Sequence, residues 1–240
     1  MTPFHKRQLS ATTKRMAEDM TIRNLSPNTI DSYTYHVDKF LRHFSQPAEQ
    51  LGPEEIRSWQ LHLIQEKKIG WSSFNQAVCG LRFLYRFTIP RAWHVKMIPF
   101  GKRPKKLPTV LGHDQVMRLI ECTTNRKHRM LLLTLYSAGL RLSEGSHLQA
   151  TDINSDRMTL QVMQGKGNKQ RLVPMSPRLL EALRQYWREA RPTSYLFPGR
   201  DDQTPISGTT IQKAIKVAAV KANLSRSITP HTLRHSYATN

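Results

Sequence analysis

The segment Tyr136-Ser137-Ala138-Gly139-Leu140-Arg141-Leu142-Ser143-Glu144 decides the fold expected for the second half of this chain. Gly139 is placed to end one helix, and Ser143 with Glu144 can begin the next. We therefore expect Arg141 at a tight corner between two helices. A guanidinium fixed there presents a fork of donors that suits a bidentate contact with phosphate. Taken alone, the segment favours an ordinary surface arginine over a phosphate-binding one.

A second polar cluster, His231-Thr232-Leu233-Arg234, lies close to the end of the sequence. Thr229 is a plausible N-cap and Pro230 a first-turn residue, so we expect a helix in which His231 and Arg234 share a face. The N-terminus of a helix also favours anions. This pair could hold one phosphate, although the same pattern fits a solvated helix start.

A basic turn, Gly165-Lys166-Gly167-Asn168-Lys169, separates two alternating stretches, Met158–Met163 and Gln170–Pro174. These stretches are typical of strands, so we expect a β-hairpin. The small residues around Lys166 would let its side chain reach into a groove and donate a proton. The alternative is a basic surface turn without chemistry.

The charge of the chain points to a polyanionic partner. Its 240 residues include 37 Lys and Arg against 17 Asp and Glu, a net charge of +20. Nucleic acid is the natural partner, because cationic side chains displace the counterions condensed on phosphates. A merely basic protein and one that meets an anionic membrane are the alternatives.

The sequence carries no clear signal for secretion, membrane insertion, disulfide formation or zinc binding. The first residues lack the apolar region of a signal peptide, and no apolar stretch is long enough to span a membrane. Cys79 and Cys122 have no disulfide-like or zinc-like spacing, so we expect reduced thiols, no metal and a cytoplasmic location.

The first half has the periodicity of four helices that form a bundle. The helices expected are residues 9–22, a segment after the N-cap Ser26 that runs to Phe44, a segment from Gly52 to residues 68–70, and residues 72–87. In the second half we expect helices at 113–122, 126–137, 142–148, 177–190, 208–222 and from Pro230 onward.

These elements predict a mainly α protein with a small β-hairpin or sheet, an α+β fold. Prolines and basic residues between Ile98 and Val110 interrupt regular structure. We expect three parts: a helical domain at residues 8–91, a basic linker at 92–110 and a second domain at 111–240. The linker could follow DNA or be an exposed charged loop.

The order Arg141, Lys166, His231 and Arg234, with the flanking residues 136–144, 165–174 and 228–239, resembles the tyrosine recombinase or phage integrase family. Residues 26–44 resemble the start of its helical DNA-clamping domain. The resemblance implies a SAM-like four-helix core-binding domain, followed by a tyrosine recombinase catalytic domain. It also implies double-stranded DNA as the partner and a homo-tetramer on DNA.

The resemblance implies a chemistry for each residue. A tyrosine attacks the scissile phosphate and forms a 3′-phosphotyrosyl link. Arg141 and Arg234 match residues that stabilise the transition state, His231 matches the assisting histidine and Lys166 the general acid. Glu144 is expected to support the Arg141 corner. Cationic side chains take the part of metal ions, so no cofactor and no metal are expected.

The chain also departs from the family pattern. The family's nucleophilic tyrosine lies beyond its second arginine, so we expect no nucleophile here and a catalytic domain incomplete at its C-terminus. Tyr237 stands where the family has an aromatic core residue, and Tyr136, Tyr186 and Tyr195 are expected to pack in the core. Gly145 and His147 are unusual after Glu144, and Gly145 should weaken its helix by about 1 kcal/mol relative to alanine.

Three alternative functions stay open. The first is a catalytically inactive, DNA-binding derivative of a recombinase. The second is a type IB topoisomerase, which shares the phosphotyrosine chemistry. The third is an RNA-binding protein, for which the aromatic motifs of common RNA-binding modules are missing. The sequence leaves the target site and the biological setting open, whether phage, chromosome resolution or mobile element.

Overall fold

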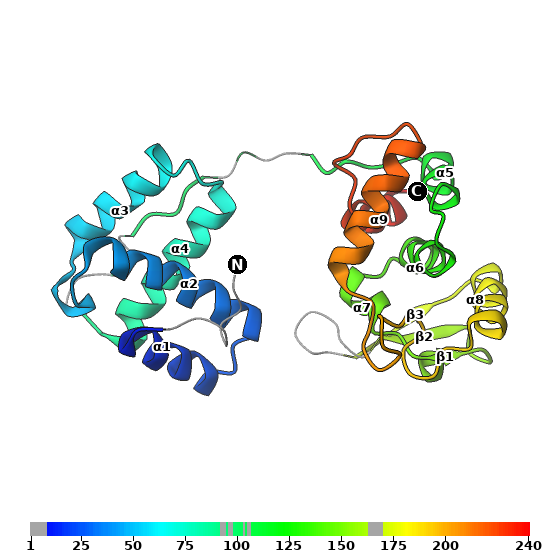
Figure 1. The fold of residues 1–240 in the computed structure, drawn as a ribbon, viewed down its shortest axis with the longest axis horizontal. Helices are drawn as coiled ribbons and strands as arrows, with labels where there is room; N and C mark the ends of the chain where they lie inside the picture. Colours follow the sequence, from blue (N-terminus) through cyan, green and yellow to red (C-terminus); the bar gives the residue numbers. More distant parts are fainter. Residues whose placement is uncertain (1–8, 92–94, 96–97, 103, 105–106, 163–169) are drawn as a thin grey trace. The chain divides into compact units, whose positions relative to one another are not determined.

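The computed structural model describes residues 9–91, 95, 98–102, 104, 107–162 and 170–240 (Figure 1). The chain divides into two compact units, residues 1–105 and residues 106–240. The boundaries predicted at residues 91 and 111 stay a prediction, because part of the segment between them lies outside the described residues. No helix in the described part of the chain is long and apolar enough to cross a membrane.

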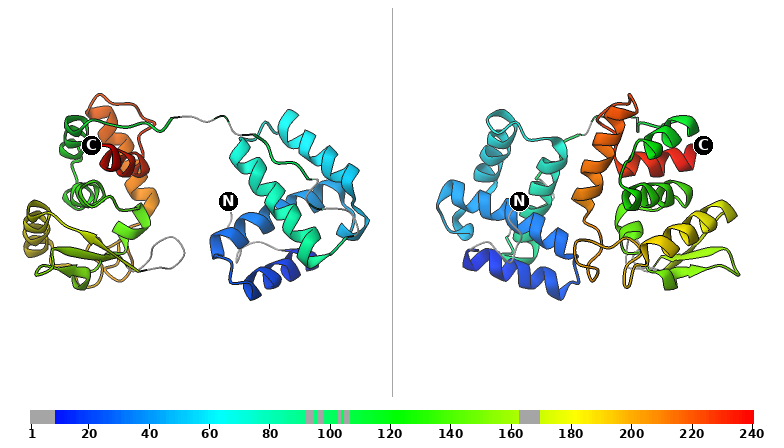
Figure 2. Two further views of the ribbon diagram at one scale, coloured as in Figure 1. Left: turned by 180° about the vertical axis from the view of Figure 1, so that it is seen from behind. Right: turned by 45° about the vertical axis from the view of Figure 1, so that its right-hand side comes forward.

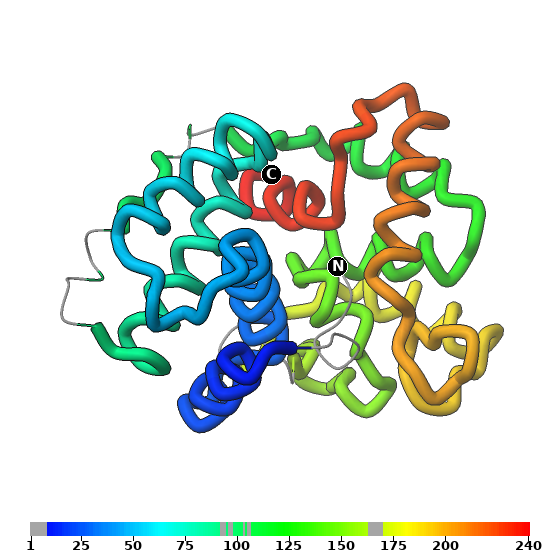
Figure 3. Tube along the Cα trace, turned by 60° about the vertical axis from the view of Figure 1, so that its left-hand side comes forward, coloured from blue at the N-terminus to red at the C-terminus, as the bar shows by residue number. Residues whose placement is uncertain are grey.

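The first unit consists of helices. They are α1 (Ala11–Ile22), α2 (Pro27–Phe44), the short η2 (Ala48–Gln50), α3 (Pro53–Gln65), α4 (Trp71–Phe83) and the π-helical continuation η3 (Leu84–Thr88). Figure 3 follows the four main helices from α1, in dark blue, to α4. Because α2 packs on both α1 and α4, their apolar faces close one core around Met16, Phe40 and Leu81. The predicted four helices are confirmed.

Helix starts in this unit follow the sequence signals. The Ser26 hydroxyl accepts a hydrogen bond from the backbone N–H of Thr29, and Pro27 occupies the first helical position. At α3 the carboxylate of Glu55 accepts from the N–H of Gly52 at 2.8 Å. These local bonds satisfy donors that a helix start leaves unpaired, so the helix boundaries are encoded locally.

The second unit combines six helices and a small sheet among its described residues. The helices are α5 (His113–Glu121), α6 (Arg126–Ser137), α7 (Leu142–Ser146), α8 (Pro177–Ala190), α9 (Gly208–Lys221) and α10 (Pro230–Thr239), and η5 (Ala150–Asp152) is a short 3-10 turn. Helix α6 is central, because α5, α7, α8 and α10 all pack against it. Figure 2 shows the sheet and α8 at one end of this unit and α5, α9 and α10 at the other.

The sheet has three antiparallel strands in the order β1 (Ile153–Asn154), β2 (Thr159–Val162) and β3 (Arg171–Pro174). In the β2–β3 pair, Val162 lies opposite Arg171 and Thr159 opposite Pro174. The predicted hairpin strands are therefore confirmed, but two details were wrong. Strand β1 was not predicted, and β2 begins after Met158, whose φ of 51° places it in a left-handed turn.

Candidate functional site

The corner before Arg141 is built by the end of α6. Ala138 caps the helix, and Gly139 follows with a φ of +57°, a left-handed conformation that glycine adopts at low cost. The N–H of Leu140 donates back to the carbonyl of Leu135 at 3.0 Å, which closes the end of the helix. The tight corner predicted around Arg141 is confirmed, and Arg141 itself is the N-cap of α7.

Glu144 anchors this corner from inside the protein. Its side chain is fully buried. One carboxylate oxygen, Oε2, accepts from the backbone N–H of Arg141 at 2.8 Å, and Oε1 accepts from Nη1 of Arg141 at 2.7 Å. Arg141 is therefore held at its backbone and at its guanidinium by one side chain three residues later.

Two further arginines reach the same carboxylate from distant parts of the sequence. Nη2 of Arg171, the first residue of β3, donates to Glu144 Oε2 at 2.8 Å. Nη1 of Arg234, on α10, lies 3.6 Å from that oxygen and donates to the carbonyl of Gly139 at 2.5 Å. The arginine cluster, as we call Arg141, Arg171 and Arg234, thus surrounds one buried carboxylate.

The arginine cluster remains in contact with solvent. The side chains of Arg141, Arg171 and Arg234 are 38%, 37% and 28% exposed, whereas that of Glu144 is not exposed at all. Three positive charges against one negative charge leave a surplus of two. Such a surplus, with N–H groups open to solvent, is the arrangement expected of a site that binds an anion.

The first turn of α10 brings histidine to the same region. His231 precedes Arg234 by one helical turn and packs edge-on against His235, with ring centroids 4.4 Å apart. Thr229 is the N-cap residue as predicted, but its own side chain makes no capping bond to the backbone. Instead, Oγ1 of Thr232 accepts from the N–H of Thr229 at 3.1 Å.

The charges of the cluster shift the protonation of its members. Burial raises the pKa of Glu144, but the hydrogen bonds from Arg141 and the charge of Arg171 outweigh it, so the net pKa lies below the usual value. Burial lowers the pKa of His231, as do the neighbouring His235, Arg234 and Arg141. Glu144 is therefore ionised, and His231 is mostly neutral, at neutral pH.

The structure brings together most of the residues singled out from the sequence. Arg141, Glu144 and Arg234 meet directly, and His231 stands one helical turn from Arg234. Lys166 lies outside the described residues. Arg171 was missed. Its sequence neighbours gave no signal, because only the structure shows that Arg171 shares a face with the buried Val173 while Leu172 on the opposite face is 60% exposed.

Some expectations about packing were wrong or incomplete. Tyr136 and Tyr186 are buried as expected, but Tyr195 is only partly buried and Tyr237 is 44% exposed. The ring of Tyr237 lies against Gly139, where a side chain would overlap it. Gly145 is also more than a weak helix former. A Cβ there would lie 2.5 Å from Cδ2 of Leu135, so glycine lets α7 approach α6.

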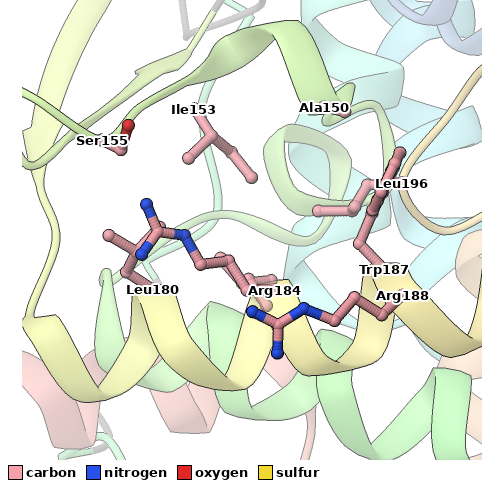
Figure 4. A pocket seen from close by; sticks show the side chains of 9 residues that line it. Ala150, Ile153, Ser155, Leu180, Arg184, Trp187, Arg188 and Leu196 are labelled. Atoms are coloured by element: carbon pink, nitrogen blue, oxygen red, sulfur yellow. The ribbon is translucent and has the colours of Figure 1, made fainter.

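No group of three potential metal-binding side chains occurs among the residues that the structure describes. A cavity of about 330 Å³ lies between α8 and the segment of η5 and β1. Figure 4 shows Arg184 and Arg188 extending from α8 along it, beside Trp187. None of its lining residues belongs to the arginine cluster, so this cavity is separate from the site.

Both units match models of known protein families. Residues 109–240 match the model of the phage integrase family, and residues 13–95 match that of the phage integrase N-terminal SAM-like domain. A protein of Sinorhizobium fredii that carries the name integrase/recombinase y4qK is 44% identical over 226 residues, which cover 94% of this chain and 73% of that protein.

Two other proteins extend the comparison. Tyrosine recombinase XerA of Pyrococcus horikoshii is 32% identical over 232 residues, covering 95% of this chain and 78% of that protein. A crystal structure of a lambda integrase dimer bound to a COC′ core site has the same fold. It has a TM-score of 0.75 at 18% identity and covers 99% of this chain and 89% of that chain.

Proposed function

This chain belongs to the phage integrase family of tyrosine recombinases, which perform site-specific DNA recombination, and we propose that it binds double-stranded DNA through the arginine cluster. The observation that carries the proposal is the positive surplus around Glu144. Three guanidinium groups share one buried carboxylate and remain partly open to solvent. A DNA phosphate supplies the negative charge that such a site lacks.

The roles proposed for the site residues follow from their geometry. Arg141 and Arg234 hold the scissile phosphate, and their charges stabilise the additional negative charge that develops in the transition state. His231, neutral in the free protein, offers one donor and one acceptor nitrogen to the phosphate oxygens or to a proton in transfer. For Lys166 the proposal rests on the family resemblance alone, as the general acid that protonates the leaving oxygen.

The nucleophile is the open part of this mechanism. Tyr136 and Tyr186 are buried, and Tyr195 packs edge-on against His147. The ring of Tyr237 lies against Gly139 at the corner of the site. We propose that none of them attacks DNA. The proposed function remains site-specific DNA recombination by the phosphotyrosine mechanism, with none of these four tyrosines as the nucleophile, and a catalytically inactive, DNA-binding derivative of a recombinase is the alternative role. A homo-tetramer on DNA and action in the cytoplasm belong to the same proposal.

The experiment that tests DNA binding is a salt titration. The affinity of the purified chain for a short fluorescent duplex is measured by anisotropy at several NaCl concentrations. We expect R141Q/R234Q to weaken binding and to lower the slope of log K against log salt by roughly two, because each arginine that neutralises a phosphate contributes about one to this slope. Unchanged binding by this variant would remove the proposal.

The matched control is R184Q/R188Q, which removes the same number of charges beside the cavity of α8. It should retain nearly all of the affinity. The nucleophile is tested with a nicked duplex that traps covalent intermediates. We expect no protein–DNA adduct in denaturing gels, and an adduct mapped to Tyr237 would contradict the proposed absence of a nucleophile.

A further inference from the structure

Arg171 occupies an unusual place for a charged residue. Residues of a strand alternate between its two faces, and Arg171 lies on the same face as Val173, which is only 4% exposed. Leu172 points the other way and is 60% exposed. The apolar residue therefore faces solvent, and Arg171, whose side chain is 37% exposed, lies on the buried face, where a partner offsets its partial loss of water.

That partner is Glu144, but Glu144 does not need Arg171 for charge balance. Arg141 already gives this carboxylate one backbone and one guanidinium hydrogen bond. One positive charge would neutralise it. Arg171 adds a second at 2.8 Å and Arg234 a third at 3.6 Å. Charge balance at Glu144 is complete without the additional charge, so the surplus that Arg171 brings points to an anion that the cluster binds.

The geometry leaves Arg171 able to bind a second group. Arg171 donates to Glu144 through Nη2 alone. Among the described residues, its guanidinium makes no other hydrogen bond. Arginine has five N–H donors in a rigid plane, so donors remain free after one contact. Arg171 and Arg234 both lie within 3.6 Å of the same oxygen of Glu144, so their guanidinium groups are close neighbours.

We propose that Arg171 is a third phosphate-binding arginine of the site: it holds Glu144 with one nitrogen and binds, with its remaining N–H groups, the same DNA phosphate as Arg141 and Arg234. This inference rests on the proposed DNA binding. The first residue of β3 then contacts the phosphate directly. This contact also explains why an arginine lies on the buried face of a strand whose leucine is exposed.

Replacement by lysine separates phosphate binding from support of Glu144. Lysine keeps the positive charge and can form one ion pair with Glu144, but its compact ammonium lacks the planar fork that contacts two groups at once. If Arg171 only supports Glu144, R171K retains both stability and DNA affinity. If Arg171 also binds phosphate, R171K folds as stably as the parent chain but binds DNA more weakly.

The test compares R171K with R157K by the same anisotropy titration, alongside thermal unfolding. Arg157 is exposed and precedes β2, at the end of the hairpin opposite to Arg171. We expect R171K to bind about fivefold more weakly, the loss of roughly one hydrogen bond, and R157K to bind like the parent. Equal affinities for R171K and R157K would overturn the inference.

A second measurement decides the matter if R171K fails to fold. The arginine Nε–H signals of the ¹⁵N-labelled parent chain are followed by NMR as the duplex is added. The Arg171 signal should move together with those of Arg141 and Arg234, and a stationary Arg171 signal would overturn the inference. If R141Q/R234Q also binds DNA normally, the proposed function fails. If only R171K does, Arg171 alone has been misassigned.

Discussion

Replacing Glu144 by glutamine should destabilise the second unit by about 2–3 kcal/mol. The side chain is fully buried and accepts two short charge-assisted bonds, from Arg141 Nη1 at 2.7 Å and from Arg171 Nη2 at 2.8 Å. A hydrogen bond to a charged group contributes about 1.5–3 kcal/mol. We take the lower end for each bond, because both arginines are more than a third exposed and water screens them.

Glutamine has nearly the same shape, so it leaves no cavity. Its oxygen can still accept from the N–H of Arg141, but its amide nitrogen is a donor that must face the donors of an arginine. The arginine cluster also loses its only counter-charge among the described residues. For a unit of this size, about 2–3 kcal/mol corresponds to a decrease in Tm of roughly 6–9 °C.

The assay is differential scanning calorimetry of the parent, E144Q and E181Q. Glu181 is the control, because its pair with Arg188 is 3.7 Å long and both side chains are 64% exposed, so E181Q should change Tm little. The lowered pKa of Glu144 means that its contribution is complete above the unfolded value of about 4.3 and disappears as pH falls through the folded value. The difference between parent and E144Q should therefore shrink below about pH 4. Equal Tm values at pH 7 would refute the reasoning.

Two other predictions concern the packing and protonation of the site. G145A should destabilise the chain in urea unfolding, because its Cβ would lie 2.5 Å from Leu135 Cδ2, and the overpacking cost of about 1–3 kcal/mol exceeds the helix gain of about 1 kcal/mol. The loss should be smaller in an L135A background, and a more stable G145A would contradict the clash. His231 should titrate below pH 6.5 in NMR, because burial and then His235 lower its pKa, and H235N should raise its midpoint. A midpoint at or above 6.5 in the parent chain would show that these neighbours do not act on His231.

Helices of this chain could be predicted because their signals are local. Ser26 with Pro27 begins α2, and Asn125 begins α6 by accepting from the N–H of His128. The hairpin was visible from its alternation and glycine-rich turn. Strand β1 was not, because it comprises only Ile153 and Asn154, too few residues for a periodic pattern.

The site could be predicted only in part, because its contacts join distant segments. The bond from Arg141 to Glu144 spans one helical turn and follows from their spacing. The contact from Arg171 to Glu144 depends on how the hairpin packs beside α7, which no local pattern specifies. The same holds for Gly145. A side chain is excluded there because Leu135 and Leu131 of another helix lie too close. Helix propensity alone predicts that this glycine is unfavourable, and tertiary packing reverses that prediction.

The surplus of positive charge separates the stability of the site from its binding. Each arginine added to the one that Glu144 already matches repels its neighbours, which is why the pKa of Arg234, after the effect of burial, is lowered further by Arg141. Removing Arg171 or Arg234 takes away a hydrogen bond or ion pair but also takes away repulsion, so the free protein should lose little stability. Removing Glu144 leaves three like charges without their anchor. Replacing Arg171 or Arg234 should therefore weaken DNA binding while leaving the free energy of unfolding nearly unchanged. Replacing Glu144 should lower both.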